Sequence, residues 1–307
     1  MTWKAIVVGV DSSPEAAWAA SFGAELAKTA GTSCHLVHAV RDVLTAFALA
    51  ELPEQAQELS ESHLTHAKDD VQHGLWGVVA PEIAEHLVIR PGRPTVVLKE
   101  IATTLDAGLI VLGGKHHTAL ERWFAGSTAL NVARTTDVPL LVTGGNRGPI
   151  RRILAAVDQS YAAQPTIKTA ERLATLLGAE LRIVCAYEPL PILPDAPGYD
   201  VDSYYRMLDE HVQREVWPLV LHPKAEKVTR HGLALDVITR EVAEWPADLV
   251  VVGSHGKGFV DRLLIGSVTE RLLNQLPTSL LVVPAHVPVN VKAAEQSGAR
   301  KTEPVFA

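Results

Sequence analysis

Apolar residues in the first half of the chain form short continuous runs separated by longer amphipathic segments. The runs Ala5–Val10, Cys34–Val40, Leu109–Leu112 and Pro139–Val142 are mostly apolar. Such runs are typical of parallel strands that are buried on both faces. A weaker run near His86–Arg90 predicts one more strand. The pattern therefore predicts five strands.

The segments between these runs predict helices. Asp11, Ser12 and Ser13 are residue types that cap helices, and the following proline at position 14 suits a first helical turn. Gly31 is a typical stop. The helices are predicted at Pro14–Thr29, at Leu52–Gly77, from Gly92 to Asp106, and between the fourth and fifth strands.

The second half of the chain repeats the first. Ala5–Asp11 reappears as Arg152–Asp158 at an offset of 147, and Leu109–Gly113 reappears as Leu249–Gly253 at an offset of 140. The second copy is therefore shorter between its second and fourth strands. Two copies of one domain fit a chain of 307 residues. We predict domains at 1–145 and 150–285 and a polar tail at 286–307.

Alternation of strands and helices predicts an α/β protein. Each copy is expected to form an open, five-stranded, mostly parallel, doubly wound sheet with helices on both faces. In such sheets, ligands bind beyond the carboxyl ends of the strands, where the strand order switches. Candidate site residues should therefore follow the first, second and fourth strands of each copy.

Composition and charge limit the kinds of partner that we expect this chain to bind. The chain has 28 basic and 35 acidic residues, a net charge of −7, which gives no electrostatic footprint for nucleic acid. No apolar run is long enough to span a membrane, and Met1–Lys4 shows no signal segment. Cys34 and Cys185 form neither a disulfide framework nor a cysteine-based zinc site. We expect a soluble, cytoplasmic protein without nucleic-acid or membrane partners.

A glycine pattern follows the fourth strand of the second copy. It runs Gly253-x2-Gly256-x9-Gly266-Ser267 and leads into the helical segment Val268–Leu276. Glycine allows close approach of a ligand to the backbone, and free N–H groups at a helix start attract anions. The alternative is a flexible loop followed by an ordinary serine cap. The position after a buried strand, with an aspartate after the first strand, favours a phosphate cradle.

This pattern resembles the ATP-binding motif of universal stress proteins. The run Val251–Gly256 and the closing strand Leu280–Val283 resemble that family as well. The resemblance covers roughly residues 3–145 and 150–285, so the chain resembles a tandem universal stress protein. It implies a Rossmann-like, adenine nucleotide alpha hydrolase-like fold. It also implies a regulatory stress-response protein rather than an enzyme, with ATP, alone or with Mg²⁺, as its ligand.

The resemblance also implies site residues. In ATP-binding members, the aspartate after the first strand and the end of the second strand hold adenosine, and the later loop and helix start hold phosphates. Asp158 could accept from a ribose hydroxyl or an adenine amino group, or could cap the next helix; both readings stay open. The implied nucleotide-binding residues are Asp158, Ala186, Val252, Gly253, Gly256, Gly266, Ser267 and Val268. No catalytic or metal-binding residue is predicted.

The first copy departs from the motif at His116, which replaces the second glycine. A positive φ at this position would strain a histidine, and the side chain would enter the phosphate space. An imidazolium could alternatively meet a phosphate. We therefore predict a weaker or altered nucleotide site in the first domain. Its candidate residues are Asp11, Ala39, Gly113, His116, Gly126, Ser127 and Thr128.

Two other functions stay open. One is slow ATP hydrolysis or self-phosphorylation, with Ser254, Ser267 or Thr269 as acceptor, although the sequence places no evident general base. The other is an interaction module without a ligand.

The fifth strands suggest how the copies associate. Val138–Val142 and Ser279–Val283 are mostly apolar, and related proteins dimerise through this edge. In a tandem chain, we expect the two copies to pair here internally, because pairing hides exposed sheet edges. A further homodimer stays open.

Overall fold

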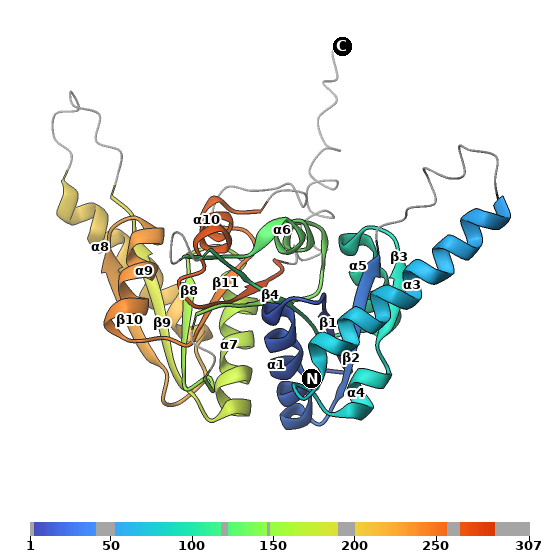
Figure 1. Cartoon of the computed structure of the whole chain (residues 1–307). Helices are drawn as coiled ribbons and strands as arrows, with labels where there is room; N and C mark the ends of the chain where they lie inside the picture. The colour runs from blue at the N-terminus through green and yellow to red at the C-terminus, as the bar shows by residue number, and fades with distance from the viewer. Residues whose placement is uncertain are drawn as a thin grey trace, which may run out of the picture.

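The computed structural model describes residues 3–40, 53–117, 122–145, 148–189, 200–256 and 265–285. Its main sheet has ten strands, with helices packed around it (Figure 1). The first half contributes β1 (Ala5–Gly9), α1 (Pro14–Ala30), β2 (Ser33–Val40), α3 (Pro53–Leu75), α4 (Pro81–Glu85), β3 (Val88–Pro91), α5 (Pro94–Thr104), β4 (Leu109–Gly113), β5 (Lys115–His117), β6 (Arg122–Phe124), α6 (Gly126–Thr135) and β7 (Leu140–Thr143). The second half contributes β8 (Arg152–Val157), α7 (Ala163–Leu177), β9 (Glu180–Tyr187), α8 (Val201–His211), a π-helical turn (Val212–Val216), a 3-10 turn (Trp217–Leu219), β10 (Glu226–His231), α9 (Ala234–Glu244), β11 (Leu249–Gly253), α10 (Ser267–Gln275) and β12 (Ser279–Val283).

Both halves have the same strand order. The order is β3-β2-β1-β4-β7 in the first half and β10-β9-β8-β11-β12 in the second, and neighbouring strands within each half are parallel. The doubly wound α/β fold expected from the sequence is thus confirmed. β7 and β12 lie side by side and antiparallel, with Leu141 opposite Leu281, so the two five-stranded sheets continue into one.

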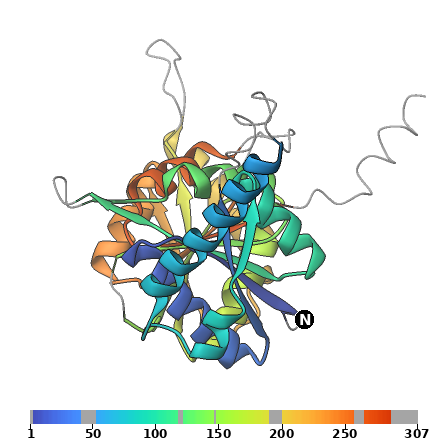
Figure 2. The ribbon, with the colours of Figure 1, turned by 45° about the vertical axis from the view of Figure 1, so that its right-hand side comes forward.

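Helices cover both faces of the sheet. One apolar cluster joins the sheet to α1, α3, α7 and α8, and a second joins the opposite face to α5, α6, α9 and α10. Figure 1 shows α1 and α7 side by side at the centre, and Figure 2 shows the long α3 crossing the front of the molecule. Ile110, Val111 and Leu281 are fully buried. Cover on both faces explains why the strands are apolar throughout rather than alternating.

The ends of α1 follow the expected signals. Its N-cap is Ser13, whose Oγ accepts a hydrogen bond from the backbone N–H of Ala16 at 3.2 Å. Gly31 ends the helix in the left-handed region, with φ of +64°. A side chain at this position would be strained, which is why glycine terminates the helix.

Some predicted boundaries were wrong. The third strand is Val88–Pro91 rather than His86–Arg90 because the short helix Pro81–Glu85 precedes it. α5 ends at Thr104, two residues before Asp106. The sequence did not predict the β5–β6 hairpin after β4. No helix within the described ranges is long and apolar enough to cross a membrane. The predicted tail, 286–307, lies outside the described residues.

Candidate functional site

A cavity of about 370 Å³ opens in the second half at the carboxyl ends of β8 and β11. These strands mark the point where the strand order switches, the place where doubly wound sheets bind ligands. All eight residues predicted for this half line the cavity: Asp158, Ala186, Val252, Gly253, Gly256, Gly266, Ser267 and Val268. Residues 257–264, most of the spacer in the motif, lie outside the described residues.

Two hydrogen bonds hold the start of α10 against the end of β11, and a third joins that strand end to β12. The N–H of Gly266 donates to the carbonyl of Ser254 at 2.8 Å. The Oγ1 of Thr269 donates to the carbonyl of Gly253, also at 2.8 Å. Ser254 in turn donates its N–H to the carbonyl of Val283 in β12. The strand end and the helix start therefore form one connected floor of the cavity.

The first turn of α10 is suited to an anion. Gly266 is the N-cap, with φ of −61° and ψ of 143°, and no side chain caps the helix. The first N–H groups of a helix have no partner within it, and the helix dipole adds partial positive charge there. Ser267, Val268 and Thr269 line the cavity at this turn. The geometry is that of a phosphate or carboxylate site.

Asp158 explains why glycine is needed at position 256. The Oδ1 of Asp158 accepts hydrogen bonds from the N–H of Ser160 at 3.0 Å and from its Oγ at 2.5 Å. A Cβ added to Gly256 would lie 2.8 Å from the Oδ2 of Asp158. The backbone of Gly256 is not left-handed, so space rather than φ requires glycine here. Asp158 does not cap α7, whose N-cap is Ala162, so the capping reading was wrong.

The sequence missed part of the cavity wall. Among the missed residues, Glu188 follows β9 and accepts a hydrogen bond from the N–H of Ala234 at 3.1 Å. Its position just after Ala186, at a strand's carboxyl end, was a usable signal. Tyr204 and Leu208 come from α8, a segment without a recognisable motif. The missed lining residues include Thr166, Glu188, Tyr204, Leu208, Ala234, Val237, Ile238 and His255.

Ser254 and His255 form a hydrogen-bonded pair at the cavity wall. The Oγ of Ser254 lies 2.8 Å from the Nδ1 of His255 and accepts from the N–H of Ala285 at 3.0 Å. The Nε2 of His255 is buried and has no hydrogen-bond partner within the described ranges. His255 lines the cavity, whereas Ser254 is buried outside its lining. Of the proposed phosphate acceptors, Ser267 and Thr269 reach the cavity.

The first half carries a smaller cavity of about 220 Å³ at the ends of β1 and β4. Six of the seven residues predicted here line it: Asp11, Ala39, Gly113, Gly126, Ser127 and Thr128. His116 lies in the extended strand β5, opposite Trp123. Left-handed backbone is therefore not the distinction between His116 and Gly256. Lys115, which corresponds to His255, also lines the cavity, and its aliphatic stem lies beside Gly126.

Metal ligands are sparse around both cavities. Within the described ranges, no three histidine, cysteine, aspartate or glutamate side chains are grouped so as to hold a metal ion. A divalent cation would need oxygens from a bound ligand in addition to single carboxylates, as Mg²⁺ uses in nucleotide sites.

The fold and the cavities define a class of doubly wound α/β proteins with one crevice at the switch point of each repeat. Residues 2–144 and 149–284 match the model of the universal stress protein family. The chain belongs to this family and contains two of its domains in tandem.

Known universal stress proteins are similar to this chain over different shares of its length. A universal stress protein of Mycolicibacterium smegmatis is 26% identical over 298 residues, which cover 91% of this chain and 96% of that protein. The crystal structure of a universal stress protein from Archaeoglobus fulgidus is similar with a TM-score of 0.63 and 17% identity, over 93% of this chain and all of that one. A universal stress protein solved in complex with cAMP covers 45% of this chain at 22% identity, with a TM-score of 0.31.

Proposed function

We propose that this chain binds ATP or a related adenine nucleotide, chiefly in its second domain, and that occupancy serves as a regulatory signal in a stress response in the cytoplasm. One observation carries the proposal. Eight residues picked out by the motif and the family resemblance line a single cavity at the switch point of the sheet. That cavity includes the uncapped first turn of α10, which supplies an anion site without a basic surface.

The cavity suits a nucleotide in size and in the distribution of polarity. Its volume of about 370 Å³ lies within the range of small-molecule sites. The turn at Ser267 and Val268 would receive phosphates, and Asp158 would accept from the sugar or the base. Mg²⁺ would be held mainly by phosphate oxygens, and Asp158 and Glu188 are the carboxylates that line this cavity.

The first domain is proposed to bind a nucleotide more weakly or in an altered way. Its cavity is smaller, about 220 Å³, and a histidine replaces the glycine that gives Asp158 its space in the second domain. Lys115 supplies a positive charge to this cavity, which preserves a preference for anions. The family resemblance implies that related single domains dimerise through this strand edge, and we propose that β7–β12 pairing takes the place of that dimer here. A homodimer of the whole chain is a separate alternative.

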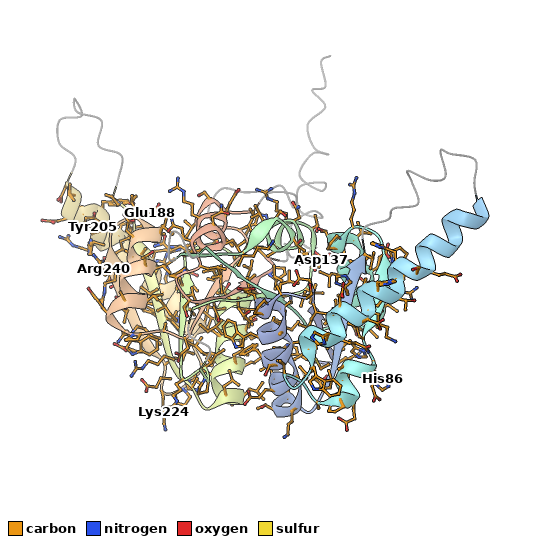
Figure 3. All side chains as sticks on the ribbon, viewed as in Figure 1. His86, Asp137, Glu188, Tyr205, Lys224 and Arg240 are labelled. Carbon is orange, nitrogen blue, oxygen red and sulfur yellow. The ribbon has the colours of Figure 1, made fainter. Side chains whose placement is uncertain are left out.

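Equilibrium binding of labelled ATP tests the proposal. Gly256→Glu should abolish binding to the second domain, because even a Cβ would lie 2.8 Å from the Asp158 carboxylate and the glutamate adds like charge. Lys224→Glu introduces the same side chain at an exposed position (Figure 3), far from Glu188 at the cavity, and should bind as the wild type does. Equal, weak binding by wild type and Gly256→Glu would reject the site.

Slow hydrolysis or self-phosphorylation is the alternative activity. The cavity lining does contain Asp158, Glu188 and His255, which are groups able to move protons. We propose binding without turnover as the main role. Phosphate release that is abolished by Gly256→Glu would instead establish an ATPase, and phosphate on Ser267 or Thr269 would establish self-phosphorylation.

An interaction module without a ligand is the remaining alternative. Native mass spectrometry of the purified chain distinguishes nucleotide binding from the ligand-free role, because a co-purified adenine nucleotide would exclude the latter. If no nucleotide co-purifies and none binds on addition, the ligand-free role is favoured.

A further inference from the structure

The cavity of the second domain has an aromatic wall. Tyr204 and Leu208, one helical turn apart on α8, both line it. Tyr204 lies outside the glycine motif, so the motif residues alone do not describe this cavity.

Tyr204 is held in place by its surroundings. Its hydroxyl donates to the carbonyl of Glu188 at 3.2 Å, and its ring centroid is 5.4 Å from that of Tyr205. Tyr205 in turn packs edge-on against His231, with centroids 4.2 Å apart. Figure 3 shows Glu188 and Tyr205 close together at the end of α8. These contacts limit the positions open to the ring.

A second set of contacts anchors this aromatic group to the sheet. His231 at the end of β10 packs edge-on against Tyr187, with centroids 5.7 Å apart. The Tyr187 hydroxyl donates to the Oδ1 of Asp209 in α8 at 3.0 Å. α8 is thus tied to both β9 and β10, and the wall is preorganised before any ligand arrives.

The sheet order separates the wall from the anion site. In the order β10-β9-β8-β11-β12, α8 connects β9 to β10 on one side of β8, whereas the loop to α10 follows β11 on the other side. The lining away from α10 is largely apolar, with Leu208 from α8 on one face of the sheet and Ala234, Val237 and Ile238 from α9 on the other. A ligand that spans the cavity therefore needs an anionic end and a flat apolar end.

We infer that Tyr204 strengthens nucleotide binding in the second cavity by stacking its ring on the base of the bound nucleotide. The inference rests on the proposed nucleotide binding and adds the residue that holds the base. Base stacking on a protein aromatic ring is lost when the ring is removed, which weakens binding by about 5- to 100-fold. The hydroxyl positions the ring through Glu188 and does not itself read the base.

Four variants test this inference through the ATP dissociation constant measured by calorimetry. Tyr204→Ala should weaken ATP binding by about 5- to 100-fold, whereas Tyr204→Phe should stay within about threefold of the wild type because the ring remains. Tyr204→Leu, which keeps apolar bulk without a ring, should resemble Tyr204→Ala. Met207→Ala is the matched control on α8, since Met207 is 56% exposed and lies outside the cavity lining.

The outcomes separate the inference from the proposed function. Unchanged ATP binding in Tyr204→Ala and Tyr204→Leu overturns the stacking role while nucleotide binding stands. A loss in Tyr204→Phe as large as in Tyr204→Ala also overturns it, because the ring would not be the relevant group. Absence of ATP binding in the wild type rejects the proposed function itself. Melting temperatures without nucleotide identify a variant that fails to fold, and Tyr204→Leu then replaces Tyr204→Ala.

Discussion

Single residues decide how the second site is built, and the contact between Gly256 and Asp158 is the clearest case. The carboxylate occupies the space that any Cβ would need, at 2.8 Å. Both residues were identified from the sequence, but the glycine was related to close approach of a ligand and to a positive φ. Only the folded chain shows that residues 98 positions apart compete for one volume.

Gly256→Ala should therefore destabilise the protein by about 1 kcal/mol, the lower end of the cost of overpacking, because the Asp158 carboxylate has to move away from the added Cβ. The free energy of unfolding in urea measures this change. Gly74→Ala is a matched control in α3, where the added Cβ would be 3.4 Å from the nearest atom. It should stabilise the helix by up to about 1 kcal/mol. Equal effects of the two substitutions would contradict the steric explanation.

A second prediction at this scale concerns Cys34. Burial raises the pKa of its thiol from 9.0 to about 11. At pH 9 the folded protein should therefore hold only about 1% of Cys34 as thiolate, the form that reacts with iodoacetamide. In a Cys185→Ala background, alkylation should be slow at pH 9, should accelerate as the pH approaches 11, and should become fast in urea. Equal rates in the folded and unfolded chain at pH 9 would show that the pKa is not raised.

At the scale of elements, α10 combines a weak cap with an anion site. Gly266 adopts the extended backbone of an N-cap but has no side chain to offer. In contrast, α1 is capped by Ser13. Helix caps contribute about 0.5–2 kcal/mol, so α10 forgoes stabilisation where a phosphate is proposed to bind.

Gly266→Asp should stabilise the nucleotide-free protein and weaken its binding of ATP. The added Cβ would lie 3.4 Å from the nearest atom, so the position tolerates a side chain. The carboxylate would cap α10 and raise the melting temperature of the nucleotide-free protein, and it would occupy the anion site and weaken ATP binding at least about tenfold. Gly266→Asn caps without charge and should weaken binding less. Weaker binding together with a lower melting temperature would indicate general disruption instead.

For the whole molecule, the β7–β12 pair joins two sheets into one. All five residues of β12 are buried, and Leu280, Leu281 and Val282 pair with β7. The Arg134–Glu270 ion pair also crosses between the halves at 2.8 Å, but both side chains are more than a third exposed, so it contributes little. Apolar burial along the strands is the dominant link.

A chain limited to residues 148–285 should therefore self-associate. Its β12 would be an uncovered apolar edge, and such edges pair with other chains. Sedimentation analysis should show a dimer of this fragment. A monomeric wild-type fragment would contradict the prediction.

Much of the fold could be read from the sequence because it depends on local patterns. Continuous apolar runs such as Leu109–Leu112 marked strands, and Ser13 and Gly31 marked the ends of a helix. Boundaries failed where neighbouring structure decided them, as when α4 displaced the start of β3. The candidate site was likewise predicted only in part. Residues in the glycine motif were found, but Tyr204 was not, because a helix residue that reaches a distant cavity leaves no pattern in its own segment.

The sequence by itself determined the two repeats, their α/β class, and the motif residues at the switch point. Hydrophobic periodicity and glycine spacing are local properties and survive in the order of the chain. Only the tertiary structure decided which residues lie close together. Gly256 lies against Asp158, and Tyr204 lines the cavity of the second domain. Those relations arise when segments far apart in the chain are packed at one sheet end, and packing depends on all the elements together.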